Sequence, residues 1–275
     1  MKGTMMDSSY LALLIAVMSG FLELSVGAAK PQQHDAEVSL DMLTPPAGVN
    51  KAVYPFPKLD WVDAVRAHNA EAAKVASSIQ LVFDGDSITS WFANDSGPGN
   101  SGVSIWNDRY AKLGAFNFAI PGDCTQHLLW RLSQGQMNGI RPKLILLMVG
   151  TNNIDRNTDQ EIAEGNKAIV DEYRKQCPDA VILLQGIFPR GRLASDPVRA
   201  RIKAINKILA TYADGKKVHF VDLGDKFLQP DGSISAEIMR DFAHPNERGY
   251  RIWADAIQSY IDRCLTPLEA NETSK

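Results

Sequence analysis

The sequence predicts an α/β fold, a three-layer α/β/α sandwich around a five-stranded parallel sheet. Short apolar runs alternate along the chain with segments whose apolar residues recur at helical spacing. Strands that are buried on both faces form nearly continuous apolar runs, and helices cover both faces of the sheets that they build. The chain shows no internal repeat and no second composition regime, so we expect one folded domain of about 220 residues.

The expected strands are five apolar runs, at residues 79–83, 115–119, 144–149, 181–184 and 218–221. Helical patterns cover residues 61–75, 126–136, 159–175, 197–212 and 246–264. Thr158 and Glu161 form a capping-box pattern, and Pro197 and Pro245 suit the first turns of two further helices. Ligands of such sheets bind at the carboxyl ends of the strands, so the residues after each run are expected to carry the chemistry.

Charge and cysteine content exclude several classes of protein. The 275 residues include 29 Lys and Arg against 32 Asp and Glu, a formal net charge of −3, so no basic excess favours a nucleic-acid partner. Cysteines at only three positions exclude a disulfide scaffold, and their spacing matches no zinc site. Cys177 and Cys264 each lie near the end of a predicted helix, where they would either pair or act as small buried side chains. We expect no metal and no cofactor.

The first residues of the chain predict export. Lys2 precedes an apolar stretch at 10–18, and small residues follow at 27–29, a pattern typical of a secretory signal peptide over residues 1–29. The stretch is too short for a stable membrane span of ~20 residues, although an uncleaved anchor stays an alternative. Residues 30–57 are rich in proline and indicate an extended lead-in, 58–268 the folded domain, and 269–275 a polar tail. We therefore expect a secreted or periplasmic protein.

A serine follows the first expected strand, in the segment Asp84-Gly-Asp-Ser-Ile-Thr89. A serine on a tight strand-to-helix turn is exposed for nucleophilic attack, and the following helix N-terminus favours negative charge near its oxygen. Thr89 replaces the second glycine of the Gly-x-Ser-x-Gly elbow, and no Gly-Lys-Ser/Thr phosphate loop occurs. Taken alone, this segment is equally consistent with a helix cap.

Two further strand ends offer hydrogen-bond donors. Gly122 follows the second run and allows close approach of the backbone, with its N–H free to donate, although a plain turn glycine is the simpler interpretation of it alone. Asn152 and Asn153 follow the third run. An amide at this position either supplies a fixed neutral N–H donor or caps the next helix.

An acid and a histidine precede the last predicted helix. Asp241 and His244 are three residues apart around one turn, so the carboxylate can hold one imidazole nitrogen while the other takes a proton from Ser87. A capping aspartate with a surface histidine is the alternative for this pair alone. Together, the strand ends supply a nucleophile, a base, an orienting acid and oxyanion donors. Four neighbours are expected to line the pocket or order its loops: Asp86, Asp123, His127 and Asn153.

These blocks resemble the SGNH (GDSL-type) hydrolase superfamily over most of residues 79–264. The segments NFAIPGDCTQHLLWRL, at 117–132, and GIFPRG, at 186–191, resemble the intracellular platelet-activating factor acetylhydrolase catalytic subunits and their bacterial relatives. The resemblance implies a flavodoxin-like sandwich with Ser87 as nucleophile, His244 as base and Asp241 as its partner. It also implies an oxyanion hole made by the backbone N–H groups of Ser87 and Gly122 and the side-chain amide of Asn152.

Two features depart from that resemblance. Pro121 stands where close relatives often have another glycine, and the expected signal peptide differs from the intracellular animal enzymes. The phospholipid substrate and the partner of those enzymes therefore do not carry over directly, although the resemblance suggests a homodimer.

The sequence thus predicts a carboxylic ester hydrolase that works through an acyl-enzyme. A secreted carbohydrate O-acetylesterase is the leading expectation, because the related enzymes favour short acyl groups and the chain carries no inserted lid. A short-chain lipid or aryl esterase is the alternative. Outside the enzymes, a catalytically silent carbohydrate-binding module would use the same scaffold.

Overall fold

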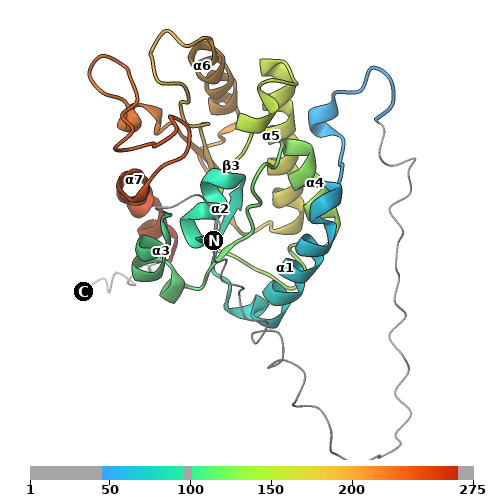
Figure 1. The fold of residues 1–275 in the computed structure, drawn as a ribbon. Helices are drawn as coiled ribbons and strands as arrows, with labels where there is room; N and C mark the ends of the chain where they lie inside the picture. The colour runs from blue at the N-terminus through green and yellow to red at the C-terminus, as the bar shows by residue number, and fades with distance from the viewer. Residues whose placement is uncertain (1–44, 96–100, 266–275) are drawn as a thin grey trace, which may run out of the picture. The chain divides into compact units, whose positions relative to one another are not determined.

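The computed structural model describes residues 45–95 and 101–265, which all belong to one folded unit (Figure 1). The expected signal peptide, the first part of the lead-in and the polar tail lie outside the described residues, so these boundaries stay predictions. Among the described helices, none combines the length and apolar character that crossing a membrane requires.

The central sheet has five parallel strands in the order β2-β1-β3-β4-β5, which confirms the predicted fold class. The strands are β1 (Leu81–Gly85), β2 (Ala115–Asn117), β3 (Leu144–Met148), β4 (Val181–Gln185) and β5 (Val218–Val221). β2 ends at Asn117, two residues earlier than expected, and Asn117 is its last paired residue. Its side chain accepts from Ala119 N at 3.0 Å and donates to Thr89 O at 2.7 Å, which turns the chain toward the glycine loop.

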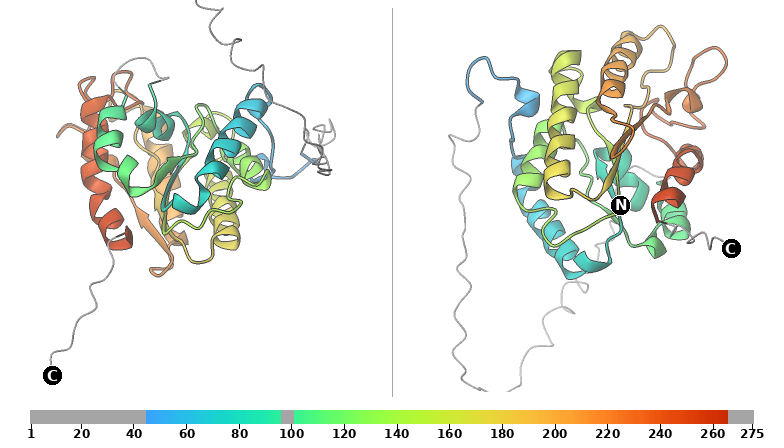
Figure 2. Two further views of the ribbon diagram at one scale, coloured as in Figure 1. Left: turned by 90° about the horizontal axis from the view of Figure 1, so that it is seen from below. Right: turned by 180° about the vertical axis from the view of Figure 1, so that it is seen from behind.

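Helices cover both faces of the sheet, as Figure 2 shows for α7 on one side and α1 and α5 on the other. The apolar residues of one face pack against α1 (Val62–Lys74), α4 (Thr125–Ser133), α5 (Asp159–Gln176) and α6 (Pro197–Leu209). Those of the other face pack against α2 (Ser87–Ala93), α3 (Val103–Arg109) and α7 (Glu247–Leu265). Successive side chains of β3 point to opposite faces of the sheet. Ile145 and Leu147 pack in one layer, and Leu144 and Leu146 pack in the other.

Short 3₁₀ turns connect these elements: Lys51–Val53, Leu59–Trp61, Ala76–Ser78, Ala111–Leu113, Thr151–Asn153, Ala210–Tyr212 and Gly224–Phe227. The capping box of Thr158 and Glu161 and the first-turn Pro197 are confirmed. The first-turn assignment of Pro245 is wrong. Pro245 forms an isolated bridge with Met239, and Asn246 precedes α7, where its side chain accepts from Gly249 N at 3.1 Å.

The cysteines are all free thiols in the structure. Cys177 packs with the apolar residues of one face of the sheet and Cys264 with those of the other. A bond between Cys177 and Cys264 would have to cross the sheet, so the structure selects the simpler interpretation of unpaired side chains.

Candidate active site

The turn after β1 presents Ser87 as the first residue of α2. Asp86 is the N-cap residue, and its Oδ1 accepts from Ile88 N at 3.0 Å. Gly85 is required before it, because a Cβ there would lie 2.1 Å from the Met148 carbonyl oxygen. Ser87 keeps 6% of its surface exposed, so little of the residue is open to solvent.

His244 links Ser87 to Asp241 by two hydrogen bonds. Its Nε2 lies 2.9 Å from Ser87 Oγ, and its Nδ1 lies 2.7 Å from Asp241 Oδ2. The other carboxylate oxygen accepts from the backbone N–H groups of Ala243, at 3.1 Å, and His244, at 2.8 Å. Burial raises the pKa of Asp241, but the hydrogen bonds from the backbone and ring of His244 outweigh it, and the net shift is downward. The carboxylate is therefore charged and faces the imidazole.

Neighbouring segments hold the loop that carries His244. Phe242 adopts a left-handed backbone with φ 61°, and its carbonyl accepts from Gly191 N at 2.9 Å. The Trp91 ring packs on the His244 imidazole at 4.5 Å between centroids. Tyr250 OH donates to Ile88 O at 2.8 Å and ties α7 to α2. The loop thus reaches Ser87 across 157 residues of sequence because two helices on the same face of the sheet are bonded together.

The strand order brings the expected oxyanion donors to either side of Ser87. β1 lies between β2 and β3, so the loop of Gly122 and the turn of Asn152 flank the serine. Gly122 has φ 79°, a conformation that favours glycine. Asn152 Nδ2 donates to the Asp123 carbonyl at 2.9 Å, which ties the amide to the Gly122 loop and leaves its second N–H for a ligand.

Four further residues were expected to line the pocket or to order its loops. In the structure, all four hold neighbouring segments in place. Asp86 caps α2, and Asp123 is paired with Arg131 through Nε at 2.9 Å. Asn153 is fully buried, with its Oδ1 accepting from Thr125 N at 3.0 Å. Burial lowers the pKa of His127 to about 4, so the ring is neutral, and its Nδ1 accepts from Cys124 N at 3.0 Å.

Sequence reasoning missed a buried ionic network beneath the Gly122 loop. Arg131 Nη2 lies 2.8 Å from Asp84 Oδ1, and its Nε lies 2.9 Å from Asp123 Oδ2, with all three side chains at most 2% exposed. Gln136 and Tyr173 complete the network through hydrogen bonds to Asp84. An arginine inside the apolar run Leu128-Leu-Trp-Arg-Leu132 is the signal that points to a buried partner.

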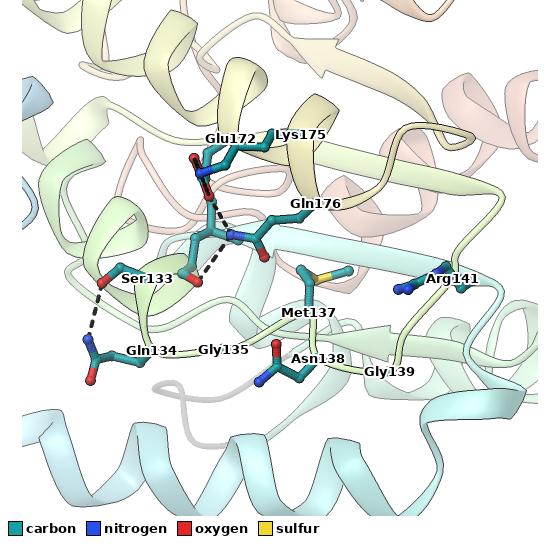
Figure 3. A pocket seen from close by; sticks show the side chains of 11 residues that line it. Ser133, Gln134, Gly135, Met137, Asn138, Gly139, Arg141, Glu172, Lys175 and Gln176 are labelled. Atoms are coloured by element: carbon teal, nitrogen blue, oxygen red, sulfur yellow. Dashed lines mark hydrogen bonds and ion pairs between the residues drawn. The ribbon is translucent and has the colours of Figure 1, made fainter.

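A large cavity lies away from this site. It measures about 880 Å³ and is lined by the end of α4, the loop that follows it to Arg141, and the C-terminal part of α5 (Figure 3). These segments are at the amino ends of the strands, whereas Ser87, Gly122 and Asn152 follow the carboxyl ends. In the part of the chain that the structure describes, no group of three or more His, Cys, Asp or Glu side chains could hold a metal ion. The expected lack of a cofactor stays a prediction.

A serine, a histidine and an aspartate in hydrogen-bond succession, on a doubly covered parallel sheet, define a serine hydrolase. Residues 83–252 match the GDSL-like lipase/acylhydrolase family, and the chain belongs to this family. The protein is therefore an ester hydrolase, which disfavours the silent binding module.

Proteins with similar sequences support the assignment to an ester hydrolase family. Platelet-activating factor acetylhydrolase IB subunit alpha1 from Rattus norvegicus is 33% identical over 225 residues, covering 79% of this chain and 92% of the relative. Subunit alpha2 from the same organism is 37% identical over 172 residues, covering 62% and 74%.

Solved structures share the fold. A GDSL-like lipase from Bacteroides thetaiotaomicron superposes with a TM-score of 0.58 at 19% identity, covering 73% of this chain and 98% of that chain. An acetyl xylan esterase superposes with a TM-score of 0.56 at 22% identity, covering 66% and 100%. At these identities the likeness establishes the architecture alone.

Proposed function

We propose that this protein is an exported serine esterase that removes acetyl groups from carbohydrates, with Ser87 carrying the acyl intermediate. The observation that carries this mechanism is the unbroken hydrogen-bond chain from Ser87 Oγ through His244 to Asp241. Such a chain activates a hydroxyl that is otherwise a weak nucleophile.

In the first half-reaction, Ser87 Oγ attacks the ester carbonyl carbon and His244 Nε2 takes its proton. Asp241 accepts the Nδ1–H and stabilises the imidazolium that forms. The tetrahedral oxyanion accepts from Ser87 N–H, Gly122 N–H and Asn152 Nδ2–H, each worth roughly 3–4 kcal/mol of barrier. The oxyanion then collapses, the bond between the carbonyl carbon and the alcohol oxygen breaks, and His244 gives its proton to the leaving alcohol, so the acyl group stays on Ser87.

In the second half-reaction, water attacks the acyl-serine carbonyl and gives a proton to His244 Nε2. The same donors stabilise the second oxyanion. Its collapse breaks the acyl bond to Ser87, which recovers its proton from His244, and the carboxylic acid is released. The proton balance closes with the ester, one water molecule and the side chains of Ser87 and His244.

The low exposure of Ser87, 6% of its surface, supports a short acyl group such as acetyl. The large apolar side chains exposed in the described residues are spread over different segments, at Val49, Leu59, Val75, Leu113 and Leu193. Contact with a lipid surface requires a contiguous apolar patch, and exposed residues on five separate segments are not by themselves evidence of one. Both observations favour an acetylated carbohydrate over a phospholipid aggregate, and the acetyl xylan esterase with the same fold makes acetylated xylan the first glycan to test.

A short-chain lipid esterase is the second candidate. It is favoured by the platelet-activating factor acetylhydrolase subunits, which are 33–37% identical to this chain. Both candidates share the acyl-enzyme and differ in the alcohol that leaves.

The test separates the mechanism from the substrate. Purified wild type and Ser87→Ala are assayed for acetate release from acetylated xylan, from acetylated xylo-oligosaccharides and from an sn-2 acetyl phospholipid. We expect wild type to release acetate fastest from the glycans and Ser87→Ala to release none. Full activity in Ser87→Ala would overturn the mechanism, whereas preferential phospholipid cleavage would overturn the carbohydrate assignment alone.

Export and a homodimer are part of the proposal and have their own measurements. The N-terminal sequence of the protein recovered from the producing cell's periplasm or medium should begin after residue 29. Light scattering should give twice the mass of the processed chain. A full-length cell-associated product, or a monomer, would remove the corresponding part of the proposal.

A further inference from the structure

A lysine lies against the loop that carries the Gly122 oxyanion donor. Lys58 Nζ donates to the Pro121 carbonyl oxygen at 2.7 Å. A Cβ built on Gly122 would lie 2.9 Å from the same nitrogen, so the ammonium lies directly beside Gly122. The left-handed backbone, with φ 79°, is the reason for glycine at this position.

A short turn fixes the ammonium in this position. Lys58 precedes the 3₁₀ turn Leu59–Trp61, and Trp61 N donates to Lys58 O at 2.8 Å. The same turn brings the Trp61 ring to 4.7 Å from Lys58 Nζ, within the range of a cation–π contact. Trp61 itself packs with Val65, Ile120 and Trp130, so the ring is anchored next to Pro121. Lys58 is thus held from two sides.

The bond to Pro121 acts on the Gly122 N–H. Pro121 C=O and Gly122 N–H belong to one planar peptide unit and point in opposite directions in a trans peptide. A cation on the oxygen fixes the orientation of that plane. It also draws electron density toward the oxygen, which strengthens the N–H at the other end as a donor.

We propose that Lys58 is a positioning residue that acts through the Pro121–Gly122 peptide to hold and polarise the Gly122 oxyanion donor. This inference rests on the proposed function, because it takes Gly122 N–H as an oxyanion donor for Ser87 chemistry. In this proposal Lys58 acts through the peptide and not on the reacting atoms. Its contribution appears as the oxyanion forms, so removing the charge lowers kcat and leaves KM nearly unchanged.

The experiment compares Lys58→Met, Lys58→Gln and Lys58→Arg on an aryl acetate. We expect Lys58→Met to lower kcat about tenfold with KM within about twofold. Lys58→Gln, which keeps a neutral donor, should fall between Lys58→Met and wild type. Lys58→Arg, which keeps a charged donor, should recover kcat to within about threefold of wild type. Lys112→Met, an exposed lysine in the turn Ala111–Leu113, controls for the loss of one positive charge.

Two outcomes overturn the inference. Lys58→Met with the kcat of Lys112→Met would show that the lysine does not act on the donor. A rise in KM alone, equal in Lys58→Gln and Lys58→Arg, would show a binding role instead. Ser87→Ala in the same assay tests the proposed function separately: if it stays active, the Ser87 mechanism fails, whatever Lys58 does. Thermal melting of each variant, with midpoints near wild type, ensures that folded protein is compared.

Discussion

Two carboxylate sites near the carboxyl edge of the sheet hold a basic partner in opposite settings. Asp241 lies on the rim, with 48% of its side chain exposed, and reaches His244 three residues away. Asp84 and Asp123 lie beneath the Gly122 loop, at most 2% exposed, and share Arg131. In the proposed mechanism the exposed pair transfers protons, whereas the buried network holds the Gly122 loop. The comparison therefore predicts that rim residues affect catalysis and that network residues affect stability.

The energetics of the two regions differ for the same reason. An exposed pair gains little stability because water screens it and solvates either partner alone. A buried pair cannot lose one partner without leaving an uncompensated charge in the protein interior. Substitutions at the rim should therefore reduce turnover in a stable protein, whereas substitutions in the network should reduce stability.

The largest expected effect is that of Asp241→Asn. The amide oxygen keeps the acceptor for the backbone N–H groups of Ala243 and His244, but the amide nitrogen then faces His244 Nδ1. The imidazole is held in the wrong tautomer, with a proton on Nε2, and cannot take the proton of Ser87. We expect kcat on an aryl acetate to fall about 10³–10⁴-fold.

The same variant should melt within a few degrees of wild type. A loss of stability as large as the loss of activity would contradict the separation of the two regions. So would a kcat within tenfold of wild type, because the carboxylate would then not hold the tautomer.

The next largest effect is on stability, in Arg131→Met. Methionine fills much of the arginine's volume but leaves Asp84 and Asp123 buried without their cation, which should cost about 3–5 kcal/mol of unfolding free energy. Urea denaturation followed by circular dichroism measures this loss. Arg251→Met is the matched control, because Arg251 pairs with Glu247 on an exposed helix face and should cost less than about 1 kcal/mol. Equal losses in the two variants would contradict a structural role for the network.

The contrast between the regions also explains what the sequence could predict. Asp241 and His244 are neighbours in the chain, and Ser87, Gly122 and Asn152 each follow an apolar run, so local pattern and the rule for parallel sheets identified them. The structure brings all five into one site. Their catalytic roles stay predictions until the variants are measured.

What could not be predicted depends on contacts between distant residues. Arg131 contacts Asp84, which is 47 residues away in the sequence. The residues around each of them do not indicate which partner it has. α3 was not predicted because seven residues are too few for a helical repeat of apolar positions. In the sequence, Lys58 is indistinguishable from an ordinary surface lysine, and only the fold shows its contact with Pro121.

The smallest expected effect is on the pH dependence of stability, where the buried Asp86 should differ in sign from the exposed Asp241. Burial raises the pKa of Asp86 to about 7, with a further contribution from Asp123, against the lowering effect of its hydrogen bond from Ile88 N. The carboxyl group thus binds its proton more tightly in the folded protein than in the unfolded chain, where the pKa is about 3.9. Its contribution to stability is fully present below that unfolded value and is lost as pH rises through about 7. Asp241, whose pKa is lowered, has the opposite sign and loses its contribution as pH falls.

Asp86→Asn removes the titration and keeps the cap, since asparagine is as good an N-cap residue as aspartate. Wild type should therefore lose about 2–3 kcal/mol relative to Asp86→Asn between pH 5 and pH 8. Unfolding free energies of both proteins, measured by urea titration at pH 5, 6, 7 and 8, give this difference directly. Parallel curves would mean that Asp86 is ionised throughout, and that burial alone does not separate the buried carboxylates from the one on the rim.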